Sequence, residues 1–211
     1  MASDALRQRW FLRARGNISS MSEARGLPVI LLSGWPGSGK STVGRSLASR
    51  LGAALVDQDT VTGPLVAVVA DMVGVHDLDD VRLAGPTRDA RYETVAAVAE
   101  ENLRAGIPVV LVAPFSRERR DPRAWEALDR RLRAAGGTPL LIWLQLEPTA
   151  VVARLRVRGA SRDLAKLADP DSFVAGLDQG APVGPHVVVD AEQPAADVVE
   201  EIVTLLSADP A

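Results

Sequence analysis

The segment that most constrains this chain is a glycine-rich turn that follows a short apolar run. The run is Val29-Ile30-Leu31-Leu32, and the turn fits the pattern G-x-x-x-x-G-K-[ST] over residues 34–42. In such a segment a buried strand leads to backbone N–H groups that surround phosphate oxygens, and the following helix directs the positive end of its dipole at them. The residues expected to form this phosphate-binding loop are Gly34, Pro36, Gly37, Ser38, Gly39, Lys40, Ser41 and Thr42.

The residues after the turn have the pattern of an amphipathic helix. Val43, Leu47 and Leu51 recur at helical spacing and Gly52 is a typical helix end, which predicts a helix from about residue 40 to residue 51. At the start of such a helix, Lys40 reaches the β- and γ-phosphates of a nucleotide and the Ser41 hydroxyl binds Mg²⁺. We therefore predict that the chain uses ATP and Mg²⁺.

The basic residues are almost all arginine, because only Lys40 and Lys166 among the 24 basic residues are lysine. A sequence that uses arginine wherever either cation serves keeps lysine where a compact ammonium is needed. Lys40 fits this interpretation because the loop holds a point charge. Lys166 is a functional candidate by the same argument. The alternative is that this position is a lysine by chance.

Length and composition indicate one domain with a full core. The chain has 211 residues, enough for one α/β domain and too few for two large ones. A net charge of −3 argues against a protein that coats nucleic acid. The absence of cysteine excludes disulfides and thiol catalysis, and two histidines are too few for a histidine metal site. No apolar run is long enough to cross a membrane, and we expect a cytoplasmic protein, monomeric or homodimeric.

We expect residues 1–26 to be a flexible leader and residues 27–211 to be a single domain. The leader is rich in arginine, and Trp10-Phe11-Leu12 is too short for the apolar core of a secretory signal. Termini that are not tied into a fold are usually loose.

Apolar periodicity alternates along the rest of the chain between strand and helix patterns, which is typical of an α/β fold with a parallel sheet covered on both faces. The predicted strands are residues 29–32, 53–56, 107–112, 139–146 and 186–190. The predicted helices are residues 40–51, 63–73, 87–106, 122–135, 148–158 and 195–206. Pro64 is expected at the first position of the second helix, and residues 74–85 are expected to be irregular.

Two aspartates follow the second predicted strand, at the edge of the sheet where open α/β folds bind ligands. We predict that Asp57 holds the metal and that Asp59 accepts the proton of a hydroxyl group, which suits phosphoryl transfer. The alternative is that Asp59 only caps the next turn.

These residues resemble the small P-loop kinases of the nucleoside-monophosphate-kinase-like fold, such as shikimate, gluconate and adenylylsulfate kinases, and the related zeta-toxin-like and antibiotic phosphotransferases. The resemblance covers residue 27 to the C-terminus. It implies a three-layer P-loop NTPase sandwich with five parallel strands in the order 2-3-1-4-5. It also implies that Asp57 and Asp59 contact metal and substrate hydroxyl. In this group strand three often ends without a Walker-B aspartate, as Val112-Ala113-Pro114 does here.

The same resemblance implies an arginine-bearing lid after the helix that follows strand four, here about residues 154–171. Arg158 and Arg162 flank Gly159, a plausible hinge, and are predicted to be catalytic because a γ-phosphoryl group in transfer carries charge that a cation must neutralise. A solvated helix face is the alternative interpretation of this basic segment.

The acceptor site is only loosely defined by the sequence. Arg91 and Tyr92 on the long predicted helix, Arg117 after strand three and Lys166 in the lid are candidates for substrate contacts. An ordinary surface position is the alternative for each of them.

Together these features predict an ATP-dependent phosphotransferase that acts on a hydroxyl group of a small molecule. One alternative is a polynucleotide 5′-hydroxyl kinase, whose loop is similar. Residues 60–62 lack the arginine that those enzymes carry after their aspartate, so nucleic acid is not our expected partner. The other alternative is a nucleotide-binding regulatory protein with little catalysis, which would need the metal ligand but no base.

Overall fold

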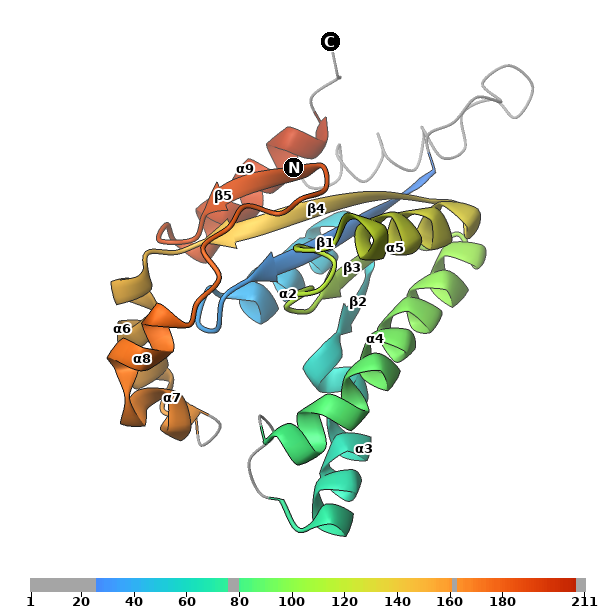
Figure 1. Ribbon diagram of the computed structural model, residues 1–211. Coiled ribbons are helices and arrows are strands. Elements are labelled where there is room, and N and C mark those ends of the chain that lie inside the picture. Colours follow the sequence, from blue (N-terminus) through green and yellow to red (C-terminus); the bar gives the residue numbers. More distant parts are fainter. Residues whose placement is uncertain (1–25, 76–79, 161–162, 208–211) are drawn as a thin grey trace, which may run out of the picture.

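The structure, a computed structural model, describes residues 26–75, 80–160 and 163–207. Its centre is a parallel sheet of five strands in the order β2-β3-β1-β4-β5, as the resemblance implies (Figure 1). The strands are β1 (Leu27–Gly34), β2 (Ala54–Asp57), β3 (Val109–Val112), β4 (Gly137–Gln145) and β5 (His186–Asp190).

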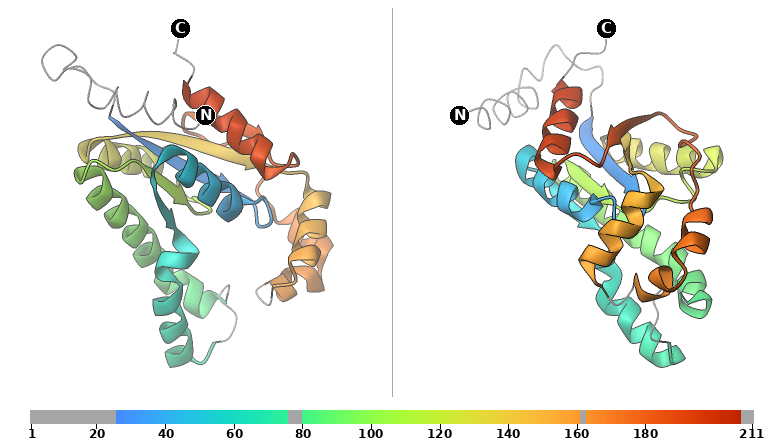
Figure 2. Two further views of the ribbon diagram at one scale, coloured as in Figure 1. Left: turned by 180° about the vertical axis from the view of Figure 1, so that it is seen from behind. Right: turned by 90° about the vertical axis from the view of Figure 1, so that its left-hand side faces the viewer.

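Helices cover both faces of the sheet (Figure 2). The face that carries Ile30, Leu32 and Val110 packs with α2 (Lys40–Leu51), α6 (Pro148–Arg158) and α9 (Ala195–Ser207). The opposite face, with Val29 and Leu31, packs against α4 (Val81–Arg104) and α5 (Pro122–Ala134). Because alternate side chains of β1 enter two different cores, the strand is an uninterrupted apolar run, as expected for a buried parallel strand.

Two groups of helices extend beyond the end of the sheet that carries the phosphate loop (Figure 1). On one side α3 (Gln58–Val73) and the first part of α4 form an arm with its own small core of Val66, Ala70, Val75 and Leu83. On the other side lie α6 and the short helices α7 (Leu164–Ala168) and α8 (Pro170–Ala175). The sheet edge between them is where the expected ligand site lies.

The predicted beginnings of the two arm helices are wrong. Helix α3 begins at Gln58 and contains Pro64, and α4 begins at Val81 and contains Pro86. Asp57 and Asp80 cap these helices, because their carboxylates accept hydrogen bonds from the backbone N–H groups of Asp59 and Arg82. The capping aspartates set the helix starts, and each proline is accommodated several residues further on.

Other predicted boundaries differ from the structure by a few residues, and α7 and α8 were not predicted as separate helices. No helix among residues 26–75, 80–160 and 163–207 combines the length and apolar character needed to span a bilayer. The predicted leader (apart from Gly26) and the predicted catalytic residue Arg162 lie outside the described residues.

Candidate nucleotide and phosphoryl-transfer site

The phosphate loop leads from β1 into α2 through two glycines with left-handed backbone conformation. Gly37 has φ of 81° and Gly39, the residue before α2, has φ of 87°, a conformation that disfavours any side chain. No side chain caps this helix and its first turn contains no acidic residue. The N-terminus of α2 therefore offers backbone N–H groups and a positive dipole end to an anion.

The ammonium group of Lys40 lies at the mouth of this loop. Its Nζ donates hydrogen bonds to the carbonyl oxygens of Gly34 at 2.8 Å and Trp35 at 2.9 Å. These contacts hold the charge beside the N-terminus of α2. A phosphate group placed there would meet both the ammonium and the backbone donors.

Lys40 is part of a cleft of about 360 Å³, which we call the phosphate-loop cleft. It brings together the loop, the ends of β2 and β3, the first residues of α3, one residue of α4, and residues from α6 to α7. The lining residues are Pro36, Gly37, Gly39, Lys40, Ser41, Thr42, Asp57, Gln58, Asp59, Arg91, Val112, Ala113, Pro114, Arg158, Asp163 and Lys166.

Asp57 and Asp59 enter the cleft in different ways. Asp57 is buried at the end of β2, paired in the sheet with Val112, and its Oδ1 accepts the N–H of Asp59. Asp59 is more exposed, and its Oδ1 lies 2.8 Å from Nη2 of Arg91 on α4. Arg91 also donates through Nε to the hydroxyl of Thr62 at 3.2 Å. The arm thus fixes the orientation of Asp59, whereas the sheet fixes Asp57.

The residues of this cleft fit a nucleotide with Mg²⁺. The structure shows no group of three or more His, Cys, Asp or Glu side chains in its described part that could hold a metal alone. Mg²⁺, however, is usually bound by one or two protein oxygens together with phosphate oxygens and water. Ser41 and Asp57 line the same cleft as the phosphate loop and supply such oxygens.

The α6–α7 side of the cleft contains an arginine that is held by a buried carboxylate. Nε and Nη2 of Arg158 donate to the two oxygens of Asp163 at 2.7 and 2.6 Å, and the Asp163 side chain is 1% exposed. Two of the five guanidinium N–H groups of Arg158 are used in this way. Lys166 lines the cleft on the same side, so the two lysines of the chain lie in one cleft.

The structure divides the four predicted substrate residues between two places. Arg91 and Lys166 line the phosphate-loop cleft. Tyr92 and Arg117 instead line a separate cleft between α4 and α5. Neighbouring helical residues such as Arg91 and Tyr92 point about 100° apart, so they cannot serve one pocket equally.

Sequence reasoning missed two residues of the site. Gln58, between the two aspartates, is 4% exposed, and its Nε2 has no hydrogen-bond partner among the described residues although it lines the cleft. Its position within Asp57-Gln58-Asp59 was the available signal. Asp163 was passed over as part of a basic segment, although it holds Arg158.

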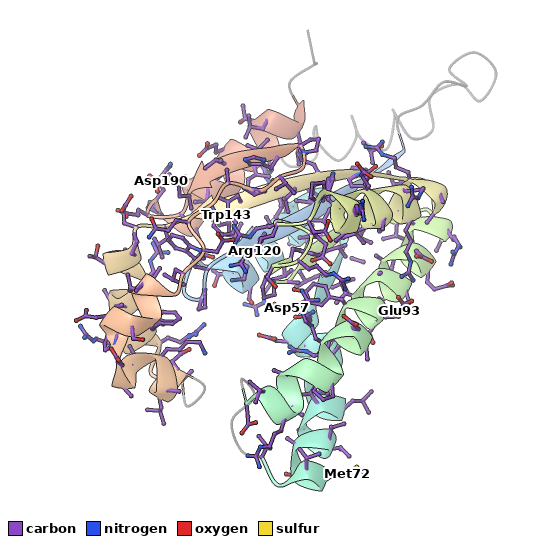
Figure 3. The ribbon with its side chains drawn as sticks, viewed as in Figure 1. Asp57, Met72, Glu93, Arg120, Trp143 and Asp190 are labelled. Carbon is purple, nitrogen blue, oxygen red and sulfur yellow. The ribbon has the colours of Figure 1, made fainter. Side chains whose placement is uncertain are left out.

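A second polar network, centred on Asp178, contacts the phosphate loop through Trp35. Trp35 contacts the ring of Trp143 in β4 edge-on, and its Nε1 donates to the carbonyl of Asp178 at 2.9 Å. The guanidinium of Arg119 lies over the ring of Trp143 and donates to the Asp178 carboxylate at 2.7 Å. Figure 3 labels Trp143 in the sheet, the neighbouring Arg120 and Asp57 at the sheet end.

Comparisons with known proteins agree with this geometry. The family model AAA_33, described as an AAA domain, matches residues 29–178. A shikimate kinase of Bradyrhizobium diazoefficiens is 31% identical over 192 residues, which cover 88% of this chain and 82% of the relative.

Solved structures share the fold at lower sequence identity. A sugar kinase from Janibacter sp. HTCC2649 aligns with a TM-score of 0.57 and 20% identity over 86% of this chain and 95% of its own. A gluconokinase from Sinorhizobium meliloti aligns with a TM-score of 0.53 and 21% identity over 87% and 94%. The chain belongs to the AAA domain family, and its relatives identify it as a small P-loop kinase.

Proposed function

We propose that this protein transfers the γ-phosphoryl group of ATP to a hydroxyl group of a small molecule. The observation that carries the proposal is that Lys40, Ser41, Asp57 and Asp59 line a single cleft. Phosphoryl transfer depends on positioning and charge neutralisation more than on covalent chemistry. The 31% identity to a shikimate kinase over most of both chains supports a kinase activity.

The phosphate loop would bind the nucleotide phosphates through the N-terminus of α2 and the ammonium of Lys40. When bound, Mg²⁺ would neutralise charge on the phosphate oxygens, with the Ser41 hydroxyl and Asp57 as its protein ligands. Lys40 already lies beside the loop, held by the carbonyl oxygens of Gly34 and Trp35. Its role is to exchange these contacts for phosphate oxygens.

Asp59 would accept the proton of the acceptor hydroxyl as the hydroxyl oxygen attacks phosphorus. The ion pair with Arg91 fixes the carboxylate at the cleft, and a fixed base contributes about 10²- to 10⁴-fold to such a reaction. Arg158 and Lys166 line the α6–α7 side of the same cleft and would neutralise the transferred group. Gln58 Nε2 is a buried donor available to the acceptor or to a phosphate oxygen.

An acceptor-stimulated ADP-release assay tests this function. The panel contains shikimate, gluconate, other sugars, nucleosides and hydroxylated antibiotics, each with ATP and Mg²⁺. We expect at least one acceptor to raise ADP release above the acceptor-free rate, and Asp59→Asn to abolish that increase.

The matched control is Asp71→Asn, which removes an exposed carboxylate from the same helix outside the cleft and should behave as wild type. Slow ADP release that no acceptor changes, in wild type and Asp59→Asn alike, would contradict the proposal. That outcome would favour a nucleotide-binding regulatory protein.

A further inference from the structure

A second cleft, of about 580 Å³, lies between α4 and α5 and shares no lining residue with the phosphate-loop cleft. We call it the α4–α5 cleft. Its volume is typical of small-molecule sites. Apolar side chains line it at Val95, Ala96, Leu111, Phe115, Ala124, Ala127 and Leu128.

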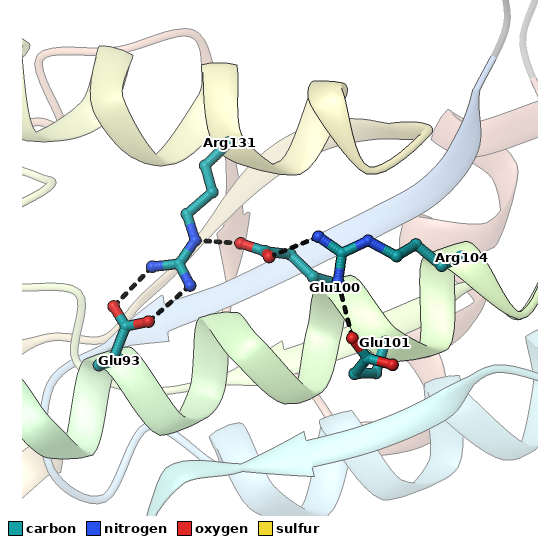
Figure 4. A network of polar contacts seen from close by, with 5 residues as sticks. All are labelled: Glu93, Glu100, Glu101, Arg104 and Arg131. Carbon is teal, nitrogen blue, oxygen red and sulfur yellow. Dashed lines mark hydrogen bonds and ion pairs between the residues drawn. The ribbon is translucent and has the colours of Figure 1, made fainter.

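Ion pairs join the two helices beside this cleft, and two of the paired residues, Glu93 and Arg131, also line it (Figure 4). Arg131 of α5 donates through both terminal nitrogens to the Glu93 carboxylate at 2.6 Å each, and through Nε to Glu100. Arg104 donates to Glu100 and Glu101 from within α4. A planar guanidinium bound at three positions fixes the spacing of the two helices. The cleft is therefore part of the packed structure.

Glu118 is the unusual residue of this cleft. It is 9% exposed, and its Oε2 has no hydrogen-bond partner in the part of the chain that the structure describes. A buried carboxylate oxygen without a partner is costly, because this oxygen has lost its hydration and gained no hydrogen bond in exchange. The charge of Glu118 also acts on Tyr92. Burial raises the pKa of Tyr92, and the nearby Glu118 carboxylate raises it further.

Three of the four arginines that line the cleft are directed to other groups, and the fourth, Arg123, is an exposed residue of α5. Arg88 lies 4.6 Å above the ring of Tyr92 and donates to the Ser116 hydroxyl at 3.2 Å. Arg131 is bound by Glu93 and Glu100. Arg117 is 59% exposed and approaches Asp89 at 3.8 Å. Within the described residues, then, no cation of the cleft forms an ion pair with Glu118.

The loop that carries Glu118 begins with a strained residue. Phe115 is fully buried and has φ of 46°, the one non-glycine residue with positive φ in the described structure. Its ring meets Tyr92 edge-on with 6.0 Å between centroids, so both aromatic rings border the cleft near the carboxylate. Strained backbone of this kind is found more often at binding and catalytic sites than elsewhere.

We propose that the α4–α5 cleft binds a small molecule that carries a protonated amine on an apolar, ring-sized body. The ammonium would donate to Oε2 of Glu118, and the body would lie against Tyr92, Phe115 and Leu128. A cation is preferred over a neutral donor because it supplies both the missing hydrogen bond and the missing countercharge. This site does not depend on phosphoryl transfer in the other cleft.

The experiment is an NMR titration of the full chain with phenethylammonium and three other ring-bearing primary amines. The matched probes are 2-phenylethanol, which keeps the ring and a neutral donor, and 3-phenylpropionate, which reverses the charge. We expect saturable amine binding that Glu118→Gln weakens at least tenfold. The control Glu126→Gln removes an exposed carboxylate of α5 that does not line the cleft and should bind as wild type.

Two further measurements distinguish the loss of a ligand contact from misfolding of the Glu118 variant. Ala127→Trp fills the cleft while keeping Glu118 and should block amine binding. Glu118→Gln should melt at or above the wild-type temperature, because a carboxylate kept for a ligand does not stabilise the fold. Absence of binding by all four amines, equal binding of 2-phenylethanol, unchanged affinity in Glu118→Gln, or a lowered melting temperature of that variant would each overturn the proposal.

Discussion

Arg91 and Asp59, separated by 32 residues in the sequence, form an ion pair in which Nη2 lies 2.8 Å from Oδ1. The pair joins the first turn of α3 to the middle of α4 beside the phosphate loop. Because Arg91 also holds Thr62 through Nε, its guanidinium is bound in two directions and cannot rotate freely. The proposed base therefore has an orientation set by the arm.

Substitutions of Asp59 and Asp57 are expected to change different kinetic quantities. Asp59→Asn should lower kcat for acceptor phosphorylation by about 10²- to 10⁴-fold, roughly 3 to 5 kcal/mol, with little change in nucleotide affinity. Asp57→Asn should instead raise the Mg²⁺ concentration needed for half-maximal rate. Steady-state kinetics at varied Mg²⁺ separate the two, and normal turnover of both variants at saturating Mg²⁺ would refute both assignments.

Replacement of either lysine by arginine should lower the activity. Lys166→Arg and Lys40→Arg keep the charge but replace a compact ammonium with a planar fork, so we expect each to lose at least tenfold in kcat, about 1.4 kcal/mol. Arg45→Lys, an exposed swap in α2 outside the cleft, is the control and should leave the rate unchanged. Wild-type rates in Lys166→Arg would place that residue among ordinary surface cations.

The orientation of the Arg158 side chain is expected to depend on its two hydrogen bonds to Asp163. Arg158→Lys keeps the charge but loses the two-point contact with the buried carboxylate. It should lower kcat and speed amide exchange in α7, and Arg162→Lys should also lower kcat. Exchange over residues 163–175 with and without a non-hydrolysable ATP analogue is the measurement. Unchanged exchange and rate in both variants would mean that the segment is surface only.

Low pH should weaken the interactions of the Asp178 carboxylate with Arg119 and Arg120. The hydrogen bond from Arg120 holds the pKa of Asp178 below its ordinary value of 3.8, with Arg119 acting in the same direction. A carboxyl group with a lowered folded-state pKa stabilises the fold above its unfolded pKa and loses that contribution as the pH falls through the folded value. Asp178→Asn should therefore melt below wild type at pH 7.

The same argument fixes the pH dependence of that difference. Thermal unfolding from pH 7 to pH 2.5 should show the gap between wild type and Asp178→Asn closing below pH 3.8. Asp71→Asn, exposed on α3, should show no such trend. A gap of constant size at every pH would contradict an ionic role for Asp178.

Local signals in the sequence were sufficient to predict how the chain folds around the proposed nucleotide half of the site. The turn at residues 34–42 carries its own glycines, helix start and lysine, so β1, the loop and α2 are fixed by neighbours in the chain. Asp57 and Asp59 could be placed because parallel strands end at a common edge. Competing local rules caused the errors at Pro64 and Pro86, where capping aspartates several residues earlier set the helix starts.

The acceptor half could not be predicted in the same way. Arg91 and Tyr92 are adjacent in the sequence, yet the packing of α4 against α3 and α5 directs them to different clefts. Glu118 has no sequence pattern that marks it, and Gln58 has only its position between the two aspartates. What distinguishes both residues is a buried polar atom that has no hydrogen-bond partner among the described residues. That property arises only from tertiary packing.

The most direct test of phosphoryl transfer in the phosphate-loop cleft is ³¹P NMR of the products formed from ATP and the acceptor found in the ADP-release screen. Wild type should yield ADP and a phosphate monoester of the acceptor in equal amounts. Lys40→Met should keep the fold but retain less than about a tenth of the rate, a loss above roughly 1.4 kcal/mol. Inorganic phosphate in place of the monoester, or a rate in Lys40→Met close to wild type, would contradict the account.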